Sequence, residues 1–99
     1  MAPVIDEFWA SPTAERHMLE KHGVSSADAI EAAESTRRYR RAHDDPSGRR
    51  RYLAAGRTEG GTRLWVVFED EGDRRGRIIT ARPVRGEAEV VRHRRMRGD

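Results

Sequence analysis

The sequence lacks cysteine altogether, and this absence excludes two classes of structure. Without cysteine there is no disulfide framework and no thiolate zinc site. The four histidines, at positions 17, 22, 43 and 93, do not have a spacing that collects metal ligands on one face. We therefore expect no bound metal ion.

Long apolar runs and the familiar catalytic patterns are also missing. No stretch approaches the length of a membrane span, and the first residues lack the apolar segment of a signal peptide, which predicts a cytoplasmic protein. There is no glycine-rich phosphate loop, no Ser/His/Asp arrangement and no paired-carboxylate spacing. Gly60 and Gly61 fit a hairpin turn rather than a nucleotide cradle. We expect no cofactor.

Lysine is nearly absent, whereas arginine is abundant. Of the 20 basic residues, Lys21 is the only lysine, and it stands directly before His22. Lysine and histidine can exchange protons more readily than arginine, which stays charged. The pair can therefore take part in acid–base chemistry, but an arginine-rich composition that spared one lysine by chance is the simpler explanation.

The bulk composition predicts one small domain over residues 1–99. Only 35% of the residues are hydrophobic while 37% are charged, so the core is thin and a partner chain can complete it. The net charge is only +3, but the arginines cluster. The clusters lie at 37–41, 49–51, 74–77 and 92–97. Clustered arginine is typical of proteins that bind a phosphate backbone, and also of a merely solvated surface.

The first third of the chain predicts a short strand and a helical hairpin. Residues 3–9 read as an aromatic strand. Ser11 and Pro12 begin a helix that ends near His22, with Gly23 as its terminal glycine. A second helix follows from about residue 26 to 35, with Ala27, Ile30 and Ala33 as its expected inward face.

The remainder predicts an antiparallel meander and a closing helix. Strands are expected at 36–43, 50–57, 64–68 and 75–82, separated by turn residues. A helix is expected at 84–96, with Val84, Ala88 and Val91 as its buried stripe. The fold class is therefore α+β, in the order β-α-α-β-β-β-β-α.

Two arginines at strand ends are candidate phosphate ligands. Alternation along the strands places Arg57 on one face with Arg51, and Arg82 on one face with Thr80 and Ile78. A guanidinium held by a packed sheet binds phosphate rigidly. Each arginine can instead pair with a carboxylate such as Glu59 or Glu87.

Several segments together resemble the BrnT-type toxins of bacterial toxin–antitoxin pairs. The resemblance covers about residues 5–87, and its most specific parts are His22 to Ser25 and Arg77 to Arg82. The other matching segments are Phe8-Trp9, Asp28-Ala29, Arg51-Tyr52, Gly56-Arg57-Thr58 and Leu64-Trp65-Val66-Val67. The chain departs from the family pattern at Ala10, at Met18 and in its last helix.

The resemblance implies a RelE-like ribonuclease fold, metal-independent RNA cleavage, and an antitoxin that binds DNA. It implies a ribbon-helix-helix antitoxin with an acidic contact surface. The catalytic positions carried over are Lys21, His22, Arg57, Arg77 and Arg82. RNA-binding positions expected beside them are Arg38, Arg40, Arg51 and Tyr52, with Tyr52 stacking on a base.

RNA cleavage by the 2′-hydroxyl needs a proton acceptor, a proton donor and cations around the phosphate, and these residue types suffice. On this reading three arginines clamp the phosphate, and His22 or Lys21 transfers protons. Two other readings stay open. One is a binding module of the same fold that cleaves nothing. The other is an RNA-chaperone domain whose binding weakens uniformly with salt.

Overall fold

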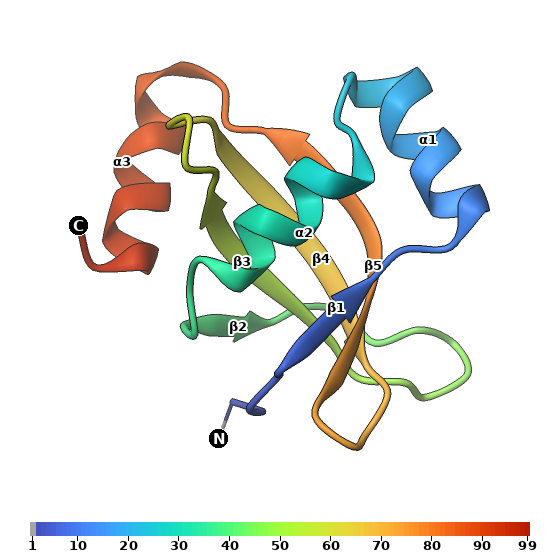
Figure 1. The fold of residues 1–99 in the computed structure, drawn as a ribbon. Helices are drawn as coiled ribbons and strands as arrows, with labels where there is room; N and C mark the ends of the chain where they lie inside the picture. Colours follow the sequence, from blue (N-terminus) through green and yellow to red (C-terminus); the bar gives the residue numbers. More distant parts are fainter. Residues whose placement is uncertain (1) are drawn as a thin grey trace.

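The computed structural model describes residues 2–99, and its elements follow the order expected from the sequence. Three helices accompany five strands (Figure 1). The elements are β1 (Glu7–Trp9), α1 (Pro12–His22), α2 (Ser26–Glu34), β2 (Tyr39–Arg41), β3 (Arg51–Arg57), β4 (Arg63–Asp70), β5 (Arg75–Pro83) and α3 (Gly86–Arg97).

The strands form one mixed sheet in the order β1-β5-β4-β3-β2. Strands β2 to β5 are the expected antiparallel meander. Strand β1 adds to it in parallel, pairing Glu7 to Trp9 with Arg75 to Arg77. A parallel neighbour needs a long crossover, and here almost the whole chain lies between the two strands. The class is therefore α+β as predicted, with a parallel edge that the sequence pattern did not show.

The two N-terminal helices begin and end where their capping residues predict. The Ser11 hydroxyl accepts a hydrogen bond from the Ala14 amide (3.1 Å), and Ser25 does the same for Asp28 (3.1 Å). Gly23 ends α1 in the left-handed region, at φ 66°, which glycine adopts without a Cβ penalty. In residues 2–99 no helix is long and apolar enough to cross a membrane.

One face of the sheet packs against α2 and forms the core. Figure 1 shows α2 lying across the sheet. Phe68, Leu64 and Val66 of β4 point to this face and are almost fully buried. The side of α2 that meets them is made of Ala29, Ala32 and Ala33. These small residues let the helix approach closely. Of the expected inward residues 27, 30 and 33, the last is buried, residue 30 packs at the edge of the core and residue 27 is exposed.

A bulge in β5 decides which side chains reach the opposite face. Thr80 pairs with Val67 and Ile78 with Phe68, so Ile79 is an extra residue. As a result Ile78 is buried in the core at 1% exposure, while Thr80 faces the other side with Arg82. Strict alternation had grouped Ile78 with Thr80 and Arg82, and the bulge makes that grouping wrong.

Helix α3 attaches to the opposite face through polar contacts. The His93 ring is fully buried, with Nε2 3.0 Å from the Leu64 carbonyl and Nδ1 3.2 Å from the Arg63 guanidinium. Arg97 donates to the Ala55 carbonyl (3.0 Å). The predicted apolar stripe is wrong, since Val91 is 47% exposed. The helix presents residues 89, 93, 96 and 97 to the sheet instead.

Candidate functional site

The sheet face opposite α2 holds a cavity of about 280 Å³ between the end of α1 and α3. Its floor is the exposed side of the three central strands, which α3 covers only at one end. Apolar side chains form the floor and cationic ones the rim. The lining residues are His22, Arg40, Leu53, Trp65, Val67, Thr80, Arg82, Arg92 and Met96. A floor with cations around it suits a ligand that combines flat bases with phosphates.

Arg82 is fixed in this cavity by Glu89 from the first turn of α3. Its Nη1 and Nη2 donate to the two carboxylate oxygens of Glu89 at 2.9 and 3.4 Å. The indole N–H of Trp65 donates to the same carboxylate (3.0 Å), and so does the Arg85 amide (3.1 Å). The Arg82 hydrogen bond is the main reason that the pKa of Glu89 falls to about 2. The Arg82 side chain nevertheless remains 42% exposed, so it can still donate to a ligand.

His22 is held as a neutral imidazole at the rim. Partial loss of water contact lowers its pKa below the ordinary 6.5, and the neighbouring His17 lowers it further. Arg85, Arg82 and Lys21 act in the same direction. A neutral imidazole has a free ring nitrogen that can accept a proton. His22 therefore has the form that a general base needs at neutral pH.

A second recess lies beside the cavity, under the first turns of α1. Its volume is about 440 Å³. Among its lining residues are Arg51, Arg77, His17 and Thr80, the last of which also lines the cavity. Arg51 and Arg77 both bind the fully buried carboxylate of Glu69, each at 3.1 Å.

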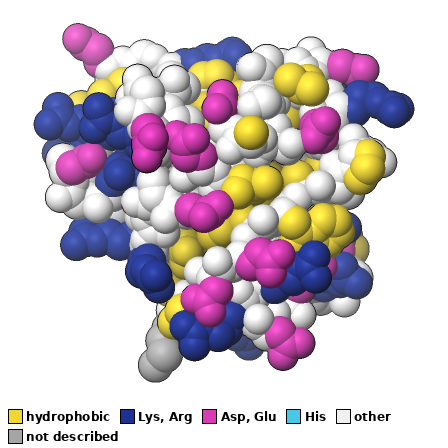
Figure 2. Space-filling model, viewed as in Figure 1, with side chains coloured by type: hydrophobic (Ala, Val, Ile, Leu, Met, Phe, Trp, Pro, Cys, Tyr) yellow, Lys and Arg dark blue, Asp and Glu magenta, His cyan; other side chains and the backbone are white. Residues whose placement is uncertain are grey.

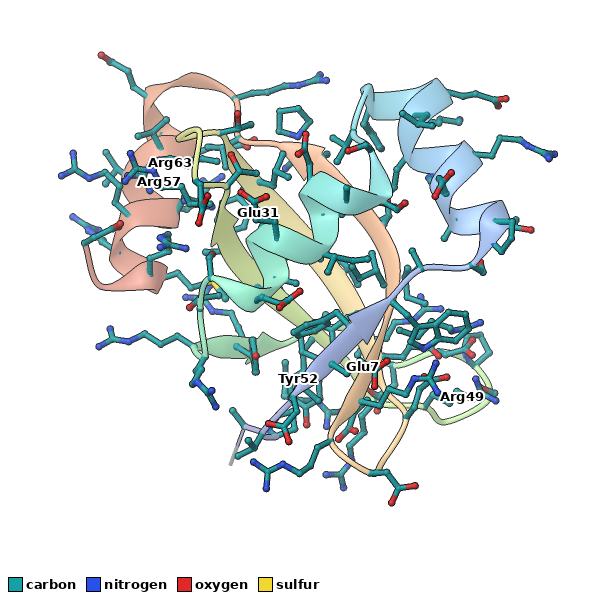
Figure 3. The ribbon with its side chains drawn as sticks, in the orientation of Figure 1. Glu7, Glu31, Arg49, Tyr52, Arg57 and Arg63 are labelled. Atoms are coloured by element: carbon teal, nitrogen blue, oxygen red, sulfur yellow. The ribbon has the colours of Figure 1, made fainter. Side chains whose placement is uncertain are left out.

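The remaining charged positions expected from the sequence lie elsewhere. Arg57 lines a hollow beside α2 with Glu31 and Ser35, and it does not line the cavity. Figure 3 shows Arg57 next to Arg63 beside α3, whereas Arg49 lies at the far end of the sheet. The guanidinium of Arg38 lies against Gly98 at the end of α3. Lys21 is exposed in the last turn of α1, one residue from His22.

Tyr52 belongs to the core and not to the cavity. It is 3% exposed and its ring stacks on Phe68, with 5.6 Å between the ring centroids. Successive strand residues point to opposite faces, so Arg51 reaches the recess while Tyr52 reaches the core. The predicted stacking of Tyr52 on a base is wrong for this fold.

Six of the nine residues that line the cavity were not among the predicted site residues. One of them is Trp65, which strand alternation places on the face opposite Leu64 and Val66. Thr80 was obscured by the bulge. The partner of Arg82 is Glu89, whereas Glu87 had been expected, because α3 begins at Gly86 rather than at residue 84.

Comparisons with known proteins agree with this architecture. Residues 9–87 match the family described as "Ribonuclease toxin, BrnT, of type II toxin-antitoxin system". The fold is similar to a crystal structure of the Brucella abortus ribonuclease toxin BrnT, with a TM-score of 0.60 and 19% sequence identity. That match covers 81% of this chain and 97% of the Brucella chain. The curated proteins gave no significant match.

Proposed function

The chain belongs to the BrnT family of ribonuclease toxins of type II toxin–antitoxin systems, and we propose that it cleaves messenger RNA in the cavity between α1 and α3. The observation that carries this proposal is the shared cavity of a neutral histidine and a fixed arginine, His22 and Arg82. The proposed setting is the cytoplasm, and the proposed unit is a single RelE-like domain.

The proposed reaction uses the RNA's own 2′-hydroxyl. His22 accepts the 2′-hydroxyl proton while the 2′-oxygen forms a bond to phosphorus and the bond to the 5′-oxygen breaks. Arg82 donates to the phosphate oxygens, on which negative charge grows. Lys21, the neighbour of His22 in α1, is the group to which we assign the proton for the departing 5′-oxygen. Arg40 and Arg92 at the rim bind the neighbouring backbone.

These groups are sufficient without a metal ion, so we propose metal-independent cleavage. Guanidinium, ammonium and imidazole groups can supply the charge and the proton transfers that this reaction needs. The products would carry a 2′,3′-cyclic phosphate on one fragment and a 5′-hydroxyl on the other.

The family implies an antitoxin partner. We propose a small ribbon-helix-helix protein whose acidic surface covers the arginines of the sheet face. Opposite charge at that face would bind the toxin and exclude RNA from the cavity.

The experiment is cleavage of single-stranded RNA by the purified chain in the presence of EDTA. His22→Ala is expected to lower the rate by about 10²- to 10⁴-fold, and Arg82→Gln by about 10²- to 10³-fold. His43→Ala is the matched control, because His43 is exposed in the segment between β2 and β3 and lines neither hollow of the site. Full activity in both site variants, with unchanged melting curves, would reject the assignment.

A non-catalytic binding module of the same fold is the second candidate. The observation in its favour is that Glu89 already occupies both terminal nitrogens of Arg82. On this alternative the wild-type chain binds RNA or its antitoxin with unchanged strength but yields no cleavage products. The same assay therefore separates the two candidates.

A further inference from the structure

We propose that the recess under α1 is a second phosphate subsite, which binds a backbone phosphate of the RNA other than the one being cleaved. Arg51, Arg77 and His17 are its ligands. The inference rests on the proposed function, since it assigns a second part of the same RNA strand to the same face of the sheet.

A buried carboxylate orients the arginines of the recess. The carboxylate of Glu69 is fully buried and contacts Arg51 and Arg77 at 3.1 Å and Arg49 at 3.6 Å. Asp45 lies 3.9 Å from Arg51. Of these arginines Arg51 and Arg77 line the recess, whereas Arg49 lines a separate hollow. Glu69 holds both guanidiniums of the recess in place, which prepares them to bind an anion.

The arginines also keep unused donors. The Arg51 and Arg77 side chains are 29% and 31% exposed, so both can be reached from the solvent. The Nε of Arg77 and the Oγ1 of Thr80 are buried, and neither has a hydrogen-bond partner among residues 2–99. The parts of these arginines that a phosphate oxygen can reach are the exposed parts of their guanidinium groups.

The first turns of α1 form the other wall of the recess. Ser11, Thr13 and His17 line it, and His17 is exposed. The N-terminus of a helix carries partial positive charge, which adds to that of the arginines opposite. A phosphate between α1 and β5 would therefore meet positive charge from both sides.

The recess and the cavity form a continuous path for one strand. Thr80 lines both hollows, and the rings of His17 and His22 are in contact, with 5.9 Å between their centroids. Along β4, Trp65 at the cavity and Glu69 at the recess are four residues apart, about 13 Å at the usual strand rise. One phosphate cannot fill both places, so the recess holds a different phosphate of the chain.

The test is the salt dependence of binding to an oligonucleotide of 2′-O-methyl RNA, which lacks the attacking hydroxyl and stays intact. The double variant Arg51→Gln/His17→Ala is expected to bind more weakly, with a slope of log affinity against log salt that is shallower by about 0.7. Arg16→Gln is the matched control, because Arg16 is exposed on the same helix and does not line the recess. Its slope should equal that of the wild type.

A second arm places one uncharged methylphosphonate linkage at successive positions of the same oligonucleotide. At the position facing the recess, the wild type should lose affinity severalfold, while the double variant should lose nothing further. Where Arg51→Gln weakens the fold, the exposed His17→Ala change alone should reproduce part of this loss.

The two proposals fail separately. Equal slopes for the wild type, the double variant and Arg16→Gln would overturn the subsite, even if RNA is cleaved. A shallower slope in the double variant together with no RNA cleavage by the wild type would support the subsite and reject the catalytic function.

Discussion

The proposed RNA cleavage depends most on His22, because the neighbours of this residue set its charge state. Its pKa is lowered by loss of water contact and by the cationic side chains around it. The neutral form is the one that accepts a proton. Lys21 beside it, the only lysine of the chain, has the opposite proposed role of proton donor.

The pH dependence of cleavage follows from that lowered pKa. The rate should fall on acidification as His22 becomes protonated, and the midpoint of this fall should lie below pH 6.5. Initial rates from pH 4.5 to 8 measure it. The residual activity of His22→Ala should lack this acidic limb. A midpoint above pH 6.5, or an unchanged limb in the variant, would contradict the role of His22.

The residue types in the sequence predicted part of the cavity. The direction in which each side chain points decided which other residues line it. His22, Arg82 and Arg40 were expected and line the cavity, whereas Arg57 was expected there but lines the hollow beside α2. Which strand residues face a common cavity depends on bulges and on how a helix docks. Trp65 joins the cavity through such tertiary packing.

At the scale of elements, the close approach of α2 to β3 depends on Gly56. A Cβ at this position would overlap the backbone carbonyl of Ala32. Gly56→Ala should therefore lower the free energy of unfolding by about 1–3 kcal/mol, as overpacking does. Urea denaturation measures the change. Gly60→Ala is the control, since its nearest atom would be the Thr58 hydroxyl at 3.8 Å, and a loss as large there would refute the packing argument.

Helix α3 is held by a neutral histidine, which makes its docking sensitive to acid. Burial lowers the pKa of His93, whose ring faces the guanidinium of Arg63 and, from α3 itself, that of Arg97. The folded protein then binds fewer protons than the unfolded chain below pH 6.5. The free energy of unfolding therefore decreases as the pH falls from 6.5 toward the lowered pKa of His93.

Urea denaturation at pH 7.5 and 5.5 tests this docking. The free energy of unfolding should be smaller at pH 5.5, and His93→Gln, which cannot titrate, should show a smaller difference between the two pH values. His22 contributes in the same direction, so part of the difference should remain. An identical pH dependence in His93→Gln would contradict the assigned role of His93.

The sequence pattern predicted helix α1 more accurately than helix α3. Helix α1 was predicted from Ser11 to Gly23 because its caps are local signals. Helix α3 was placed two residues early and on the wrong face, because its contacts are made by His93 and Arg97 rather than by apolar residues. A polar docking face has no hydrophobic period to detect.

At the scale of the whole molecule, acidic residues gather along α2, whereas the opposite side of the sheet holds the cavity with its cationic rim. Helix α2 contributes Asp28, Glu31 and Glu34 to its side, and Figure 2 shows acidic side chains around an apolar band there. The other side holds the cavity with Arg40 and Arg82 at its rim. On the proposed function, we expect the cationic rim rather than the net charge of +3 to direct RNA to the cavity.

Single charge changes on each side should therefore have unequal effects on RNA binding. Arg40→Gln should weaken the binding of 2′-O-methyl RNA, whereas Glu34→Gln should leave it unchanged near 0.15 M salt. The shortest extent of the molecule is 24 Å, while screening acts within about 8 Å at that salt concentration. Fluorescence anisotropy measures both affinities, and equal effects would contradict the assignment of one RNA-binding face.

The chemical nature of the cleaved ends tests the central claim most directly. The purified chain should cut single-stranded RNA in EDTA and leave a 2′,3′-cyclic phosphate and a 5′-hydroxyl, because the 2′-oxygen displaces the 5′-oxygen with His22 as the base. Mass spectrometry of the fragments identifies the ends. Fragments with a 5′-phosphate and a 3′-hydroxyl, or intact RNA, would contradict the account.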